Sequence, residues 1–187
     1  MTRALLVAGS AGSSAGLRAV LGVIGPGCPW AVVCAVHVSP DAGDLVGAAM
    51  TTMTRADLQI ASDCEPLTPG VVRVAPAGYH LLIDDGLLRL SQDEPVLHSR
   101  PSFDVLFRSA AEDLGPDLIA VLLSGANADG AAGLRAIRRR GGRTLVQDPA
   151  TAEFPQMPRA AVALDAAEQC LAPGAIAEQL LQWGAAP

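Results

Sequence analysis

The sequence contains no lysine: all 13 basic residues among its 187 are arginine. This absence excludes several kinds of active site within this chain. A P-loop needs a lysine on the nucleotide phosphates, and Schiff-base enzymes and Ser-Lys dyads need a lysine amine.

Cysteine is also scarce, and its spacing fits no metal site. The four cysteines form no CxxC pair, and the three histidines lie at no metal-ligand spacing from them. We expect reduced thiols, no metal and no cofactor. The cysteines are Cys28, Cys34, Cys64 and Cys170.

Charged residues make up only 17% of the chain, with a net charge of −6. This balance argues against nucleic-acid binding, which needs a basic surface, and gives no reason to expect an anionic membrane as partner. The apolar run that ends at Gly9 is too short for a secretory signal or a membrane span. We therefore expect a cytoplasmic protein without membrane insertion.

Hydrophobic residues reach 50%, and short apolar runs alternate with segments of helical periodicity. This alternation predicts an α/β fold with a mainly parallel, doubly wound sheet, in one domain over residues 1–187. Asp85-Gly86 between two apolar runs predicts a small antiparallel hairpin beside that sheet. The expected strands are Ala4–Ala8, Ala31–Val36, Val71–Ala75, Tyr79–Ile83, Leu87–Leu90, Leu118–Leu123 and Thr144–Val146. The expected helices are Ala15–Ile24, Asp41–Leu58, Phe103–Leu114 with Ser102 as N-cap, one opened by Asp129, and one from about Gly174.

The first strand runs into a turn of small residues, Gly9-Ser10-Ala11-Gly12. A dinucleotide fold would need GxGxxG here and an acidic residue after the second strand, where this chain has His37. The GxSxG elbow of many hydrolases is missed because Ala8 replaces its first glycine. A nucleotide-binding domain remains a rival hypothesis that rests on this turn alone.

Three polar residues follow strands of the expected sheet: Ser10, His37 and Asp129. Ligands bind beyond the carboxyl ends of parallel strands, so these side chains would share one edge. A serine needs a base to take its proton, and the base needs an acid to orient it. Each residue also has a structural explanation, as a turn hydroxyl, a buried hydrogen-bonding histidine and a helix N-cap.

Several motifs in order are similar to the catalytic domain of chemotaxis receptor methylesterases of the CheB type. The resemblance covers nearly the whole chain. The motifs are Val7-Ala8-Gly9-Ser10-Ala11-Gly12, Val36-His37-Val38, Val74-Ala75-Pro76-Ala77-Gly78-Tyr79-His80, Arg100-Pro101-Ser102-Phe103-Asp104-Val105-Leu106-Phe107, Leu123-Ser124-Gly125-Ala126-Asn127-Ala128-Asp129-Gly130-Ala131, and Gln147-Asp148 followed by Met157-Pro158-Arg159.

The resemblance implies hydrolysis of glutamyl methyl esters on cytoplasmic helices of methylated chemoreceptors, and often deamidation of receptor glutamines. It makes Ser10 the nucleophile, His37 the general base and then acid, and Asp129 the orienting carboxylate. The backbone amides of Ala11 and Ala126 stand at the positions of the family's oxyanion donors. We expect no receiver domain, which is usual in the family, because the first expected strand begins at Ala4.

The sequence departs from the family around the expected site. Ala11 replaces a usual threonine, and Val38 and Ala126 replace usual methionines. Asn127-Ala128 also differs from the usual residues just before the acid. The loop Ser39-Pro40-Asp41-Ala42-Gly43 lacks the usual aromatic residue. These changes bear on substrate recognition and motivate an alternative, a catalytically silent interaction module of a chemosensory-like signalling system.

Three further polar residues have a possible structural role, a possible functional role, or both. We expect His80 to make structural hydrogen bonds in a hairpin. His98 precedes the Arg-Pro-Ser motif and is a candidate for lining the cleft, and Arg100 either binds an acidic substrate or braces its loop.

Overall fold

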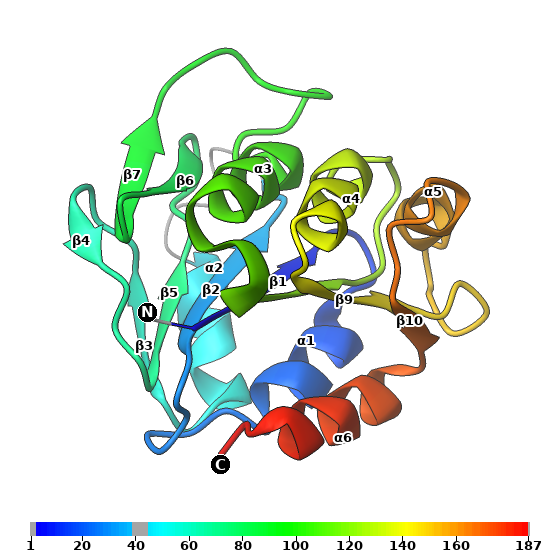
Figure 1. The fold of residues 1–187 in the computed structure, drawn as a ribbon, viewed down its shortest axis with the longest axis horizontal. Helices are drawn as coiled ribbons and strands as arrows, with labels where there is room; N and C mark the ends of the chain where they lie inside the picture. Colours follow the sequence, from blue (N-terminus) through cyan, green and yellow to red (C-terminus); the bar gives the residue numbers. More distant parts are fainter. Residues whose placement is uncertain (1–2, 39–44, 187) are drawn as a thin grey trace.

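The computed structural model describes residues 3–38 and 45–186, and its centre is a seven-stranded sheet. The strand order is β10-β9-β8-β1-β2-β5-β3, and all neighbouring strands are parallel (Figure 1). The strands are β1 (Ala4–Gly9), β2 (Ala31–Val36), β3 (Asp57–Ile60), β5 (Val71–Val74), β8 (Leu118–Leu122), β9 (Arg143–Gln147) and β10 (Gln169–Leu171).

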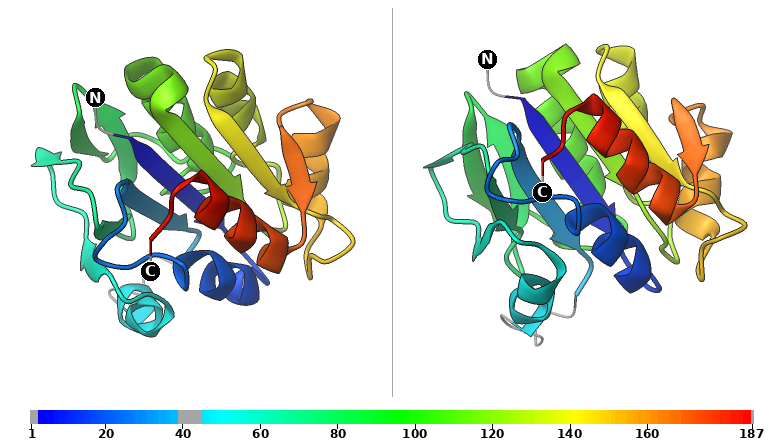
Figure 2. Two further views of the ribbon diagram at one scale, coloured as in Figure 1. Left: turned by 60° about the horizontal axis from the view of Figure 1, so that its bottom comes forward. Right: turned by 90° about the horizontal axis from the view of Figure 1, so that it is seen from below.

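Helices cover both faces of this sheet, as the alternating sequence pattern predicts (Figures 1 and 2). One face carries α3 (Phe103–Leu114), α4 (Ala131–Arg139) and α5 (Gln156–Ala163), and the other carries α1 (Ser14–Leu21), α2 (Leu45–Met50) and α6 (Pro173–Trp183). Short 3-10 turns follow α2 at Thr51–Met53 and α3 at Gly115–Asp117.

The two faces of β1 supply two separate cores, because successive side chains of a strand point to opposite sides. Leu6 and Ala8 pack in the cluster that contains Phe103 of α3 and Leu134 of α4. Leu5 and Val7 pack in the second cluster, with residues of α1 and α6. The central strand is therefore apolar throughout, and its first polar side chain comes at its carboxyl end.

A three-stranded antiparallel sheet lies beside the main sheet and contains the predicted hairpin. Its strands are β4 (Glu65–Pro66), β6 (His80–Asp84) and β7 (Leu87–Ser91). β6 and β7 join at Asp85 and Gly86, which both have positive φ, as a tight hairpin turn requires. This hairpin packs against α3.

The predicted helix Asp41–Leu58 is wrong over its second half. Helix α2 and the 3-10 turn end at Met53, and Leu58 belongs to strand β3. The segment Asp57–Ile60 alternates polar and apolar residues and pairs with β5 at the sheet edge, a period that suits a half-exposed strand. Residues 41–44 lie outside the described residues.

The sequence analysis also missed β4, β10 and α5. The first two are short strands of two and three residues, and α5 begins after Pro155 and contains Pro158 near its start. In the described part of the chain, no helix combines the length and the apolar character needed to cross a membrane.

Candidate active site

The carboxyl ends of β1 and β2 bring Ser10 and His37 to the same edge of the sheet. The parallel register pairs Gly9 with Val36, so the two polar residues follow neighbouring strand ends, which lie about 4.8 Å apart. The chain leaves β1 toward β2 on one side, while β8 pairs with β1 on the other. β1 is thus the topological switch point, where open parallel sheets bind their ligands.

Small residues shape the turn that presents Ser10. The Ser10 amide donates to the Ser124 carbonyl at 2.9 Å, which ties the turn to the loop after β8. Gly12 has φ +71°, and a Cβ there would lie 2.6 Å from Glu153 Cβ. A Cβ on Gly125 would approach Ser10 Cβ to 3.1 Å. The backbone around the serine can therefore pack closely only where side chains are missing.

The imidazole of His37 is held by a hydrogen bond and by stacking. Its Nε2 lies 2.8 Å from Asp129 Oδ2, and its ring stacks on Phe103 with the centroids 3.9 Å apart. The His37 side chain is 12% exposed. These contacts fix the ring plane and leave Nδ1 as the nitrogen that is free to accept a proton.

The carboxylate of Asp129 is fully buried and accepts hydrogen bonds at both oxygens. Oδ2 accepts from His37 Nε2 and from the Phe103 amide at 2.7 Å. Oδ1 accepts from Ser102 Oγ at 2.8 Å and from the Asp104 amide at 3.1 Å. The acid thus lies at the N-terminus of α3, where unpaired amides and the helix dipole favour a negative charge.

The expectation that Asp129 opens or caps the helix that follows it is wrong. Helix α4 begins at Ala131, with Gly130 as N-cap at φ 91°. Asp129 caps α3 instead, together with the predicted N-cap Ser102, whose Oγ also accepts from the Val105 amide. The acid therefore joins the loop after β8 to the start of a helix that precedes β8 in the chain.

The pKa of Asp129 is lowered. Burial opposes the charged form, but the hydrogen bonds from His37, the amides of Phe103 and Asp104, and Ser102 together outweigh it. The carboxyl group is therefore ionised at neutral pH, as an acid that stabilises a histidine cation must be.

Two further polar residues lie near His37: Ser99, which was not identified from the sequence, and Asn127, which was noted only as a departure from the family. Ser99 Oγ lies 3.5 Å from His37 Nδ1 and from Asn127 Nδ2. Asn127 Oδ1 accepts from the Asp129 amide at 3.1 Å. In the described part of the chain, no hydrogen bond joins Ser10 Oγ to His37. The hydroxyl that lies within hydrogen-bonding distance of His37 Nδ1 is that of Ser99. Ser99 adjoins the quoted Arg-Pro-Ser motif, which was its one sequence signal.

The amides of Ala11 and Ala126 lie in exposed turns after β1 and β8. Within residues 3–38 and 45–186, neither amide donates a hydrogen bond to another protein group. Both remain available to a ligand oxygen, as an oxyanion site requires.

A hollow of about 360 Å³ opens beside His37. His98, a candidate for lining the cleft, lines this hollow together with Val38 and Ser99. Arg100 also lines it, but its guanidinium donates to the carbonyls of Gln92 and Asp93 at 2.9 and 3.0 Å. Arg100 therefore braces its loop.

His80 has the structural role expected of it. Its Nδ1 accepts from the Ser102 amide at 3.1 Å, so Nε2 carries the proton and bonds the Glu94 carbonyl at 3.1 Å. The buried ring thus ties the hairpin to the start of α3. Within the described residues, no three His, Cys, Asp or Glu side chains are grouped to hold a metal ion. The loop Ser39–Gly43 lies outside the described residues.

Asp104 is a second buried carboxyl group near Asp129, and we predict that Asp104→Asn stabilises the protein. Burial and, to a smaller extent, the charge of Asp129 raise the pKa of Asp104 despite a hydrogen bond from the Gly133 amide. A raised folded pKa means that stability falls as pH rises from the unfolded pKa through the folded one. An asparagine oxygen can accept the same bond without a buried charge, so the gain in unfolding free energy at pH 7 should reach roughly 0.5–1 kcal/mol.

Urea unfolding of the wild type and Asp104→Asn between pH 3 and 8 measures this effect. The gain should grow as pH rises through the range where the wild-type carboxyl ionises and then level off. A variant that is less stable than the wild type at pH 7 would mean that the negative charge itself supports the fold.

Comparison with known proteins identifies relatives over nearly the whole chain. A family model described as CheB methylesterase matches residues 5–180. A putative protein-glutamate methylesterase/protein-glutamine glutaminase of Leptospira interrogans is 35% identical over 180 residues, which cover 96% of this chain and 93% of the relative. The protein-glutamate methylesterase FrzG of Myxococcus xanthus is 36% identical over 95% of this chain, which spans only 53% of that relative.

The fold is also similar to that of a solved structure from this family. The CheB methylesterase catalytic domain of Thermotoga maritima superposes with a TM-score of 0.92, at 24% identity, over 98% of this chain and 99% of that one. The predicted α/β fold with its mainly parallel sheet is therefore confirmed. The expectation of a single stand-alone domain stays a prediction.

Proposed function

Because the chain belongs to the CheB methylesterase family, we propose that it is a cytoplasmic, cofactor-independent serine hydrolase. Its substrates are the γ-methyl esters of glutamate residues on the cytoplasmic helices of chemoreceptors, and its products are glutamate and methanol. The observation that supports this most strongly is the buried pair of His37 and Asp129 beside Ser10 at one edge of the sheet.

The first half of the reaction forms an acyl-enzyme. Ser10 Oγ attacks the ester carbonyl carbon while His37 Nδ1 takes the hydroxyl proton, since Nε2 is engaged by Asp129. The ionised Asp129 stabilises the resulting imidazolium. The amides of Ala11 and Ala126 donate to the carbonyl oxygen as it becomes negative, and one such donor lowers the barrier by about 3–4 kcal/mol. His37 then gives its proton to the departing methoxide.

The second half uses water. His37 takes a proton from a water molecule, the hydroxide attacks the acyl carbon, and Ser10 leaves with the proton. A receptor glutamine would enter by the same route and release ammonia in place of methanol. Relatives named both methylesterase and glutaminase support this second activity.

The decisive experiment is methanol release from methylated chemoreceptor cytoplasmic domains of the same organism. We expect release that is proportional to the amount of enzyme and needs no added metal or nucleotide. Binding of the receptor domain without methanol or ammonia release would favour the silent interaction module. Thermal stabilisation by a nucleotide would revive the nucleotide-binding alternative, since a ligand of the folded state alone raises its stability.

A further inference from the structure

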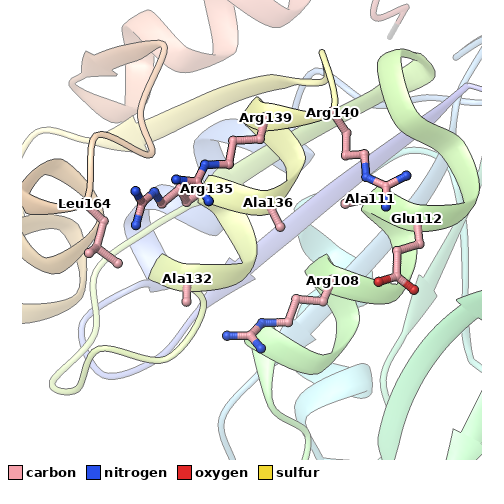
Figure 3. Close-up of a pocket in the computed structure, with 9 residues that line it drawn as sticks. All are labelled: Arg108, Ala111, Glu112, Ala132, Arg135, Ala136, Arg139, Arg140 and Leu164. Carbon is pink, nitrogen blue, oxygen red and sulfur yellow. The ribbon is translucent and has the colours of Figure 1, made fainter.

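A second hollow, of about 520 Å³, lies between α3 and α4, away from the triad. Its floor is made of small apolar side chains, among them Ala111, Ala132 and Ala136. Four arginines surround the floor: Arg108 on α3, Arg135 and Arg139 on α4, and Arg140 just after α4 (Figure 3). We name this surface the arginine hollow.

The charges of the arginine hollow are only partly balanced by carboxylates of the described residues. The ion pairs among the described residues involve other arginines, and none of these four takes part in one within 4.0 Å. Among the described residues, Glu112 is the one acidic side chain that lines the hollow, and the charge of Asp104 acts on Arg108 from the same helix. Four of the 13 arginines of an acidic chain therefore gather on one surface where they outnumber the carboxylates, which favours binding of a negatively charged partner.

The hollow lies along the helices that begin at the candidate active site. Asp129 lies two residues before α4 and accepts hydrogen bonds from the first amides of α3. At about 1.5 Å per helical residue, Arg135 lies roughly 9 Å and Arg139 roughly 15 Å along the chain from Asp129. A rigid partner that reaches the triad with one residue can therefore reach the arginines with residues two to three helical turns away.

The shape and spacing fit an acidic α-helix. Arg135 and Arg139 are four residues apart and project together from α4, on the side where Leu164 lies (Figure 3). Side chains at this spacing lie about 5–6 Å apart, which is also the spacing of glutamates at i and i+4 on a partner helix. The alanine floor lets a helix backbone approach closely. Guanidinium groups pair with carboxylates in two-point contacts that lysine cannot make.

A nucleic acid fits the hollow less well than an acidic protein. Among the described residues, no aromatic side chain lines it to stack on a base, and the net charge of the protein is −6. The surface selects for carboxylates on a folded segment.

We propose that the arginine hollow is the docking surface for an acidic helical segment of the protein substrate, which positions a neighbouring glutamyl ester at the triad. This inference rests on the proposed function. It assigns part of the substrate affinity to Arg108, Arg135 and Arg139, while the chemistry stays with Ser10, His37 and Asp129.

Charge reversal tests the proposal. The double variant Arg108→Glu/Arg139→Glu changes two exposed side chains, so the fold should persist. At low salt, KM for a methylated receptor cytoplasmic domain should rise roughly tenfold or more, with kcat within twofold of the wild type. Hydrolysis of a short peptide that carries one glutamyl methyl ester should not change. The difference in KM should shrink at 0.5 M salt, where the screening length is only a few Å.

A matched control separates local docking from net charge. Arg18→Glu/Arg55→Glu produces the same charge change at two exposed arginines outside the hollow. An equal rise in KM in this control, or an unchanged KM in the hollow variant, would overturn the proposal.

A direct binding measurement keeps the docking surface distinct from the proposed activity. The probe is a fluorescent helical peptide with glutamates at i and i+4, and its binding is followed by anisotropy. Binding that the hollow variant loses and the control keeps would support the surface even if wild-type protein released no methanol. Methanol release by a wild type that does not bind the peptide would overturn the surface and leave the esterase.

Discussion

Replacing Ser10 with alanine is expected to lower the rate of methanol release by roughly 10⁴–10⁶-fold, because the acyl-enzyme can no longer form. Folding should be little affected. Ser10 is half-buried, and the contact that ties it to the loop after β8 comes from its backbone amide, which alanine retains. The measurement is methanol release from methylated receptor domains by wild type and variant side by side, with their thermal unfolding compared.

Ser99→Ala is the matched control for this prediction, since Ser99 Oγ is the hydroxyl that lies 3.5 Å from His37 Nδ1. We expect this variant to keep activity within about tenfold of the wild type, because Ser99 lies in the loop before α3 and is not the serine that the family resemblance makes the nucleophile. A serine-directed phosphonate should label Ser10 alone. A reversed pattern, with Ser99→Ala inactive and Ser10→Ala active, would move the nucleophile to the loop before α3.

The central strands and α3 could be predicted from the sequence because their signals are local. β2 and α3 have the predicted bounds: Ala31–Val36 is continuously apolar, and Ser102 precedes an amphipathic run. The edge strand β3 was mistaken for helix, because four half-exposed residues carry too weak an alternation to outweigh the alanine-rich segment before them. A tertiary contact with β5 decides the conformation there.

The site was predictable to the extent that it depends on strand ends. Ser10, His37 and Asp129 were placed on one edge because each follows a strand of the parallel sheet, and the family resemblance gave them their catalytic roles. The partners of Asp129 could not be read from the sequence, since they come from the N-terminus of α3, 25 and 26 residues away. The position of Ser99 depends on the path of the loop before that helix, for which no local signal exists.

Asp129→Asn is predicted to cause the largest combined loss of activity and stability. An amide has one acceptor oxygen, and its NH₂ group would face either the amide of Phe103 and His37 Nε2, or the amide of Asp104 and Ser102 Oγ. Buried donors would lose their acceptor in both orientations. The cost of leaving them unpaired is roughly 2–4 kcal/mol.

Activity should fall about 10⁴-fold in the same variant. With asparagine, the stable arrangement places a proton on the wrong nitrogen of His37 and offers no negative charge to the imidazolium. The stacking on Phe103 keeps the ring near its position, so the loss falls on kcat, and KM for the receptor domain should stay close to that of the wild type.

The pH dependence of stability distinguishes this account from a simple packing defect. The folded pKa of Asp129 is lowered, so its stabilising contribution is fully present above its unfolded pKa, about 3.9, and is lost as pH falls through the folded pKa. Asparagine does not titrate. The difference in unfolding free energy between wild type and Asp129→Asn should therefore be constant from about pH 5 to 8 and narrow below about pH 4. Urea unfolding of both proteins across this pH range measures the difference in unfolding free energy. A difference that stays constant down to pH 3 would mean that packing, and not the charge of Asp129, stabilises the start of α3.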